Sequence, residues 1–232
     1  MPRITLIKLL RYREWTEELG FDREWIIQDK QASLYLLLQR LFSRKGGFVI
    51  PMRYDYFLVL SNGIDEKTHQ NILTDLEPET PYGLKMVSLV HEYPFTAQLI
   101  ATRIIEDTDK KLVYLEGEED EIVVAHIDFN DITKYTGKTS VMESYARIMI
   151  IFTNITNFAS RLGGVTTYLG GDNMLAIIPK NTLKKFLKNI PSYLKVGVGI
   201  SKSPRKALLN ATKALTKIRK ERNKQYVIVS DE

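Results

Sequence analysis

The sequence predicts an α+β protein made of two tandem ferredoxin-like domains, each with the element order β-α-β-β-α-β. Two observations support this prediction. First, the chain repeats itself, because residues 46–60 align without a gap with residues 163–177, and residues 85–102 align with residues 195–212. Second, the segment between the matched strands of each half shows the periodicity of an amphipathic helix. Together these observations indicate a duplicated domain.

Each half contains the same elements in the same order. The first long helix ends before a glycine, Gly46 in the first half and Gly163 in the second, and glycine is common just beyond a helix. Its apolar face consists of Leu34, Leu37, Leu38 and Leu41 in the first half, and of Tyr145, Ile148, Phe152, Ile155 and Leu162 in the second. The other predicted elements are first strands at 4–11 and 122–129, short helices at 65–76 and 182–190, last strands at 84–90 and 194–200, and last helices at 94–105 and 203–220. The acidic, turn-rich segment 106–121 is the expected connection, which gives domains at residues 1–112 and 113–232.

The composition limits the classes of protein and of site. Hydrophobic residues make up 44% of the chain and charged residues 26%, which is typical of a soluble globular protein. No apolar run approaches the roughly 20 residues of a membrane span, and no signal-peptide pattern is present. We therefore expect a cytoplasmic protein without a membrane partner. With no cysteine and three histidines, a metal would be bound mainly by oxygen ligands.

A basic segment at residues 202–224 contains nine lysines and arginines and supplies much of the net charge of +5. Such a helix could face nucleic acid, but a solvated helix face is the commoner outcome. Because no aromatic residues are interleaved with these charges, we expect no nucleic-acid partner. A few of the charges could instead meet a triphosphate.

The hairpin at residues 168–176 is the first candidate for chemistry. Gly170 and Gly171 predict a tight turn that can bring main-chain N–H groups close to an anion, and Asp172 follows with a free carboxylate. A Gly-Gly-Asp sequence is more often only a turn. The first-half repeat of this hairpin aligns Asp55 with Asp172.

A second carboxylate, Asp128, ends the apolar strand at 122–127. A carboxylate there is costly unless its charge is compensated. In the ferredoxin-like order the first strand lies beside the hairpin, so Asp128 and Asp172 can converge and bind Mg²⁺, with the carbonyl of Phe129 as a further ligand. The repeat aligns Leu10 with Asp128, and leucine cannot ligate a metal. We therefore expect the first-half site to be degenerate.

The segment after Asp128 is polar and leads toward a helix. Its main-chain N–H groups, with those of Gly170 and Gly171, could hold a triphosphate, and Arg219 could contact a distal phosphate. Helix capping is an equal alternative for Asp131 and Thr133. His126 is expected to be a hydrogen-bonded core histidine, with a catalytic base as the alternative.

These residues carry a family resemblance. The sequence Asp-Phe-Asn-Asp-Ile-Thr at 128–133, followed by Gly-Gly-Asp-Asn at 170–173, resembles the palm domains of GGDEF proteins and class III nucleotidyl cyclases. More specifically, the chain resembles the archaeal GTP cyclohydrolase III family. The matching pieces are Ile4-Thr5-Leu6-Ile7 with Tyr12 and Trp15, Arg53-Tyr54-Asp55, Asn62-Gly63-Ile64-Asp65, Ala125-His126-Ile127-Asp128, Gly170-Gly171-Asp172-Asn173 and Lys217-Ile218-Arg219.

The resemblance implies an enzyme that opens the imidazole ring of GTP, retains the formyl group and releases two phosphates. It implies Mg²⁺, stimulation by monovalent cations such as K⁺, and a place in riboflavin or deazaflavin synthesis. It assigns Asp128 and Asp172 as catalytic residues and metal ligands. The substrate-binding candidates are Phe129, Asn130, Asp131, Thr133, Gly170, Gly171, Asn173, Arg219 and Asp55. Paired palm domains often act across an interface, so the resemblance is compatible with a homo-oligomer.

The chain departs from the family pattern in its first half, where Leu10-Arg11 replaces an Asp-Asn pair and Tyr56 replaces an Asn. Two other functions therefore stay open. One is a palm-type nucleotidyl cyclase or transferase, because the same scaffold supports several reactions. The other is a nucleotide-binding sensor without catalysis.

Overall fold

The computed structural model describes residues 1–221 and 224–231. The chain divides into two compact units, formed mainly by Met1–Glu92 with Thr96–Asp120 and by Glu121–Lys202 with the residues from Lys206 onward. Arg222 and Asn223 of the basic segment lie outside the described residues. Within the described ranges, no helix is long and apolar enough to cross a membrane.

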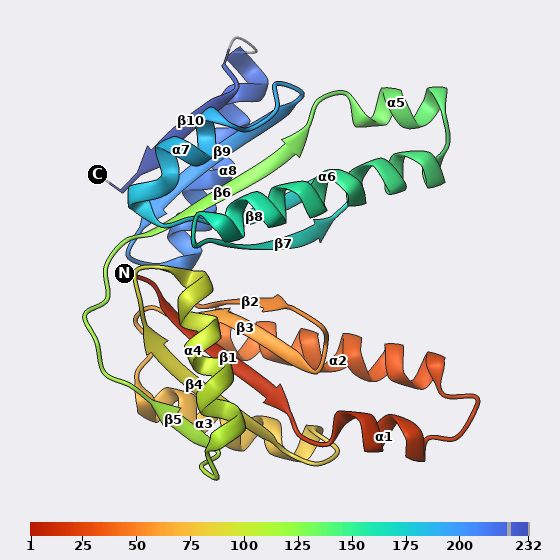
Figure 1. The fold of residues 1–232 in the computed structure, drawn as a ribbon, viewed down its shortest axis with the longest axis vertical. Helices are drawn as coiled ribbons and strands as arrows, with labels where there is room; N and C mark the ends of the chain where they lie inside the picture. Colours follow the sequence, from red (N-terminus) through yellow and green to blue (C-terminus); the bar gives the residue numbers. More distant parts are fainter. Residues whose placement is uncertain (222–223, 232) are drawn as a thin grey trace. The chain divides into compact units, whose positions relative to one another are not determined.

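The first unit is a five-stranded sheet in the order β2-β3-β1-β4-β5. Its strands are β1 (Arg3–Leu9), β2 (Phe48–Pro51), β3 (Tyr56–Leu60), β4 (Leu84–Val90) and β5 (Leu112–Tyr114). Its helices are α1 (Tyr12–Glu18), α2 (Glu24–Ser43), α3 (Glu66–Leu76) and α4 (Pro94–Asp107), with a short 3₁₀ turn at Glu77–Glu79. In Figure 1, β1 leads directly into α1, and the much longer α2 follows.

The second unit repeats this plan with the order β10-β9-β6-β8-β7. Its strands are β6 (Ile122–Phe129), β7 (Val165–Gly170), β8 (Asn173–Ile177), β9 (Leu194–Ser201) and β10 (Tyr226–Ser230). Its helices are α5 (Ile132–Lys138), α6 (Val141–Arg161), α7 (Leu183–Lys188) and α8 (Pro204–Glu221), with a 3₁₀ turn at Lys180–Thr182. Here β6 leads into α5 as β1 leads into α1 (Figure 1).

The predicted ferredoxin-like plan is confirmed, with one addition in each unit. In each sheet the first strand lies between the hairpin and the next strand, as that order requires. A fifth strand then pairs in parallel with β4 or β9, namely β5 in the first unit and β10 in the second. The expected connection at 106–121 therefore contains a strand, and the boundary expected after residue 112 falls inside it.

The two faces of the second sheet are covered differently. Alternate residues of β6, including Ile127 and Phe129, join a core with α6 and α7. Since side chains alternate along a strand, His126 and Asp128 point to the other face, which α8 covers. There the helix approaches β9 very closely, because a Cβ on Gly199 would lie 1.9 Å from the Ala207 carbonyl oxygen. The face that carries Asp128 is therefore bounded by a rigidly placed helix.

Candidate active site

Asp128 lies near the end of β6 and is only 4% exposed. Its charge is compensated by Arg219 of α8, whose Nη2 and Nε donate to Asp128 Oδ2 over 2.9 Å and 3.2 Å. The arginine side chain is 52% exposed, so its other face is open to solvent. A buried carboxylate with a partly free cationic partner is an arrangement that a divalent cation could enter.

Asp172 follows the tight turn between β7 and β8. Gly170 and Gly171 have φ of 102° and 59°, a left-handed conformation that favours glycine. Tyr168 supports the turn, because its hydroxyl donates to the Gly171 carbonyl over 2.7 Å. In the ladder between β6 and β8, Asn173 is paired with Asp128, which places Asp172 next to Asp128.

The two carboxylates are close enough for their negative charges to repel each other. Burial raises the pKa of Asp172, and the negative charge of Asp128 raises it further. A cation between them would relieve both effects. Among the described residues no group of three or more acidic or histidine side chains is placed to hold a metal ion, so a bound ion would complete its coordination with water, main-chain oxygen or substrate. Two carboxylates with such supplementary ligands are typical of Mg²⁺.

His126 is linked to the site through Asn173. His126 Nε2 lies 2.9 Å from Asn173 Oδ1, and Asn173 Nδ2 donates to Asp172 Oδ1 over 2.9 Å. Because the amide oxygen accepts, Nε2 carries the proton. Burial lowers the pKa of His126, so the ring is neutral at pH 7. It is the hydrogen-bonded histidine that the first sequence interpretation expected, and it orients Asn173.

The segment between β6 and α5 turns sharply at Asp131, which has φ of 57°. Its side chain makes no capping hydrogen bond to α5, so the capping alternative is wrong for Asp131. Asn130 is fixed by its main-chain N–H, which donates to the Tyr193 carbonyl over 3.0 Å. Thr133 lies in the first turn of α5 and is exposed.

Two cavities lie near the carboxylate pair, one lined by Asp172 and the other by Arg219, the partner of Asp128. One, of about 460 Å³, lies between α5, α6 and the β7–β8 turn. Its lining is Ile132, Thr133, Thr136, Val141, Ser144, Tyr145, Ile148, Tyr168, Gly171 and Asp172. The other, of about 610 Å³, is lined by Asn130, Asp131, Ser192, Leu194, Lys195, Arg219, Lys224 and Gln225. The first is mainly apolar and the second is polar and basic, which matches a nucleobase and a polyphosphate respectively.

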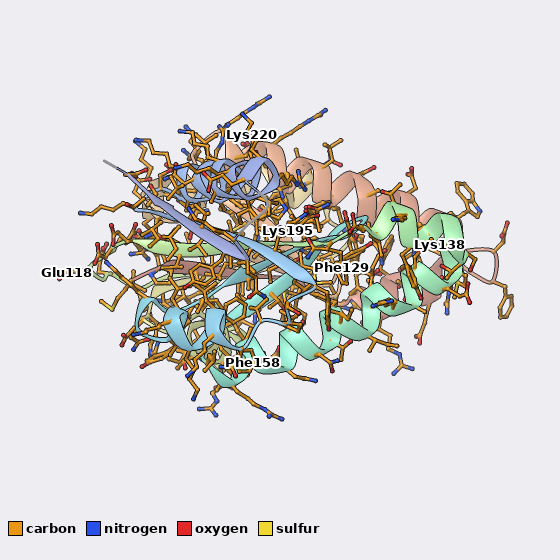
Figure 2. The ribbon with its side chains drawn as sticks, turned by 90° about the horizontal axis from the view of Figure 1, so that it is seen from above. Glu118, Phe129, Lys138, Phe158, Lys195 and Lys220 are labelled. Carbon is orange, nitrogen blue, oxygen red and sulfur yellow. The ribbon has the colours of Figure 1, made fainter. Side chains whose placement is uncertain are left out.

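Figure 2 labels Lys195, one of the residues that line the polar cavity. Phe129 and Lys195 lie close together at the strand ends, where Lys195 of β9 pairs with Asp128 of β6. The figure shows Lys138 at the far end of α5. Sequence reasoning did not select Lys195, although the repeat aligns it with Lys85, a second lysine beside the degenerate site.

The first unit corrects the expected correspondence of the two halves. Lys8 pairs with Tyr56 as Asp128 pairs with Asn173, and Lys8 pairs with Lys85 as Asp128 pairs with Lys195. The left-handed residues agree, because Arg11 with φ of 48° corresponds to Asp131. The residue equivalent to Asp128 is therefore Lys8, and the alignment of Leu10 with Asp128 was wrong by two positions. Apolar strands align in several registers, and only the ladders distinguish them.

The charges of the two sites are reversed. In the second unit a strand carboxylate meets a helix arginine, whereas in the first Lys8 Nζ donates to both Glu106 carboxylate oxygens of α4 over 2.6 Å. Tyr56 donates to the same carboxylate over 2.6 Å. Burial acts to lower the pKa of Lys8, but these hydrogen bonds outweigh it and the pKa is raised. An ammonium thus stands where a metal-binding carboxylate would have to be.

Asp55 corresponds to Asp172, as predicted, but it is already paired. The Arg53 guanidinium donates to Asp55 over 2.5 Å and 3.1 Å. Asp55 is therefore paired with Arg53, and Lys8 occupies the position at which the second unit has the carboxylate of Asp128. The degenerate first site stays a prediction, and the residue on which it depends is Lys8 instead of Leu10.

The comparisons with known proteins agree over the whole chain. A family model described as GTP cyclohydrolase III matches residues 1–232. The protein of that name from Aeropyrum pernix is 36% identical over 234 residues, which cover 98% of this chain and 96% of the relative. The one from Saccharolobus solfataricus is 34% identical over 226 residues, with 97% of both chains covered.

Two solved structures share a more distant likeness. The GGDEF domain of DgcB from Caulobacter crescentus in complex with c-di-GMP is 12% identical with a TM-score of 0.39, and the match covers 47% of this chain and 77% of that chain. A class III adenylyl cyclase-like ATP-binding protein from Pseudomonas aeruginosa is 7% identical with a TM-score of 0.36, and the match covers 100% and 83%. Likenesses at this level carry no weight for function. The full-length family match and the identity to the two named relatives show that the chain belongs to the GTP cyclohydrolase III family.

Proposed function

We propose that the chain is a Mg²⁺-dependent hydrolase that opens the guanine imidazole ring of GTP, retains the formyl group and releases two phosphates. The product is a formylamino-pyrimidine ribosyl monophosphate. The observation that carries the proposal is the convergence of Asp128 and Asp172 between an apolar and a basic cavity, in a member of this family. GTP is the substrate that the names of the relatives indicate.

The side chains fit a magnesium ion. Asp128 and Asp172 would hold it, with the Phe129 carbonyl as a further candidate ligand, and the oxygens of the substrate phosphates would complete the shell. Bound Mg²⁺ supplies positive charge and lowers the pKa of a water molecule, which suits hydrolysis at phosphorus and at carbon. Each hydrolytic event consumes one water molecule.

The two cavities divide the substrate between them. We assign the base to the apolar cavity, where the ring of Tyr145 and the side chains of Val141 and Ile148 offer flat apolar contact. We assign the phosphates to the basic cavity, where Lys195, Arg219 and Lys224 provide cations. The carboxylates lie at the junction, so a metal there would contact the phosphate end of the substrate.

Arg219 has two partners in this proposal. Without metal its guanidinium neutralises Asp128. With Mg²⁺ at the carboxylates, the metal would neutralise Asp128 in place of the guanidinium. The exposed part of Arg219 would then be available to the phosphates in the basic cavity. The sequence prediction of a phosphate contact and the observed ion pair therefore describe two states of one side chain.

Three further expectations stay proposals. K⁺ would stimulate turnover, the chain would self-associate, and its product would enter synthesis of a riboflavin- or deazaflavin-type cofactor. All three come from the family resemblance. We place none of them on particular residues.

One assay tests the function. The protein is incubated with GTP, Mg²⁺ and K⁺ while released phosphate and the ultraviolet band of guanine are followed. Loss of the purine band together with release of inorganic phosphate supports the hydrolase. Pyrophosphate with an intact purine band would indicate a cyclase instead, and binding without turnover would indicate a sensor.

Asp172→Asn should abolish the metal-dependent reaction, because it removes one of two carboxylate ligands. Asp75→Asn on the exposed side of α3 is the matched control and should leave the rate unchanged. Circular dichroism should show that both variants are folded. Full activity of Asp172→Asn would refute the metal assignment.

A further inference from the structure

We propose a separate anion site on the other side of α5, which binds a phosphate-class anion without a metal. The site is a cavity of about 270 Å³. Its lining is Phe129, Asn130, Asp131, Ile132, Lys134, Tyr135, Lys138, Arg147 and Tyr193. Neither Asp128 nor Asp172 belongs to it, so it differs from the metal site, although both share the segment between β6 and α5. Figure 2 labels Phe129 at the end of β6 and Lys138 at the end of α5, and both line this cavity.

Three cationic side chains line the cavity beside α5. Lys134 and Lys138 are four residues apart on α5 and therefore lie on one face of the helix, where like charges repel. Arg147 approaches from α6. Among the described residues none of the three takes part in an ion pair, and Asp131 is the one acidic residue of the lining. A bound anion would relieve this repulsion.

Arg147 is held in place for such a ligand. Its guanidinium carbon lies 4.6 Å from the centre of the Tyr135 ring, a cation–π contact that orients the planar group without using its N–H donors. An oriented guanidinium with free donors matches phosphate oxygens in a bidentate manner. The two lysines add point charges that require no fixed geometry.

The size of the cavity and the cationic side chains in its lining favour a small anion. The cavity volume lies below the range of about 300–1,000 Å³ that is usual for sites of drug-sized ligands. Asn130, which lines both this cavity and the polar cavity beside Arg219, has a buried Oδ1 that accepts no hydrogen bond from any described residue. The P–O–H group of a singly protonated phosphate is a donor that could satisfy this acceptor. Inorganic phosphate, pyrophosphate or the phosphate end of a nucleotide share this chemistry.

Binding is measured by calorimetry in EDTA, with inorganic phosphate, pyrophosphate and GMP as separate ligands. We expect binding by the unchanged chain and by the Asp128→Asn/Asp172→Asn variant. Substitution of Lys134→Gln, Lys138→Gln and Arg147→Gln together should weaken binding at least about tenfold, the equivalent of one charged hydrogen bond. The control changes Lys184, Lys185 and Lys188 of α7 to Gln, which removes the same charge and should alter affinity less than about twofold.

The outcomes separate cleanly. Tighter binding of phosphate or pyrophosphate than of GMP identifies a free anion, and the reverse order identifies a nucleotide phosphate. An equal loss of affinity in both triple variants would show that only the net charge of the protein matters, and would overturn the proposal. Loss of binding in the Asp128→Asn/Asp172→Asn variant would place the anion at the metal site and also overturn it.

Should the triple variant not fold, Arg147→Met alone carries the test, because Arg147 is exposed. The measurement needs neither metal nor GTP turnover. Its result therefore does not depend on the proposed hydrolysis, and failure of one proposal leaves the other intact.

Discussion

Replacing Arg219 should destabilise the chain by an amount that depends on Mg²⁺. Arg219→Met removes two hydrogen bonds to the carboxylate of Asp128, a side chain that is 6% exposed. Breaking a fully buried ion pair costs about 3–5 kcal/mol, whereas exposed pairs contribute about 0–1 kcal/mol. Because Arg219 is 52% exposed, we expect a loss of about 2 kcal/mol in EDTA. In a chain of this size that lowers Tm by about 4–8 °C.

Saturating Mg²⁺ should restore most of this loss, because the ion supplies the positive charge that Asp128 lacks. Thermal unfolding of Arg219→Met and the unchanged chain, each in EDTA and in Mg²⁺, measures both effects. Lys217→Met is the matched control, since this exposed lysine of α8 lies two residues away and should show neither effect. Equal losses for Arg219→Met with and without Mg²⁺ would refute the view that arginine and metal share Asp128.

Three other variants follow from the same geometry. Asp172→Asn should raise Tm at pH 7 in EDTA. The pKa of Asp172 is raised above its ordinary 3.8 in the folded protein, so ionisation of this carboxyl lowers the stability of the fold as pH rises through that pKa. In a pH series of melting curves, the gain should vanish near pH 3, where the carboxyl is protonated. Lys8→Met should cost about 1 kcal/mol by urea unfolding with and without Mg²⁺ alike, since an ammonium and not a metal neutralises Glu106, and rescue by Mg²⁺ would contradict the charge reversal. Gly199→Ala should lower the free energy of unfolding by about 1–3 kcal/mol in urea unfolding, because the added Cβ would clash with the Ala207 carbonyl. Unchanged stability would show that α8 can move away from β9.

The sequence was sufficient to predict the duplicated fold and the carboxylate pair. A glycine pair precedes each hairpin, Gly46-Gly47 in the first half and Gly163-Gly164 in the second, so Asp55 and Asp172 could be matched without a structure. Asp128 could be found because a charged residue ends an otherwise apolar strand. The ladder of β6 and β8 then shows the adjacency that the ferredoxin-like order implies.

Other features depend on pairing that the sequence does not display. The strand at residues 4–10 is mostly apolar, with Thr5 and Lys8 as its polar residues, so apolar matching alone allows several registers. Lys8 could not be distinguished as the counterpart of Asp128 before the ladder was known. Strands β5 and β10 are edge strands added after a helix. Their existence depends on α4 and α8 returning the chain beside β4 and β9.

The ion pair of Arg219 was also outside the reach of sequence. Arginine at the end of a basic helix is equally suited to phosphate, to solvent and to a carboxylate. The choice is decided by where α8 crosses the sheet, and that crossing depends on glycines in β9. No residue of the Lys217-Ile218-Arg219 motif indicates it.

The close approach of α8 to β9 has a mechanical consequence. At Gly197 and Gly199 the main chains of helix and strand touch without a side chain between them, and side chains are the parts of a protein that adjust most easily. Helix and strand must therefore shift together. Lys195 on the strand and Arg219 on the helix are thus held at a constant spacing on either side of Asp128. Gly197 and Gly199, which have no side chain, thus set the distance between Lys195 and Arg219.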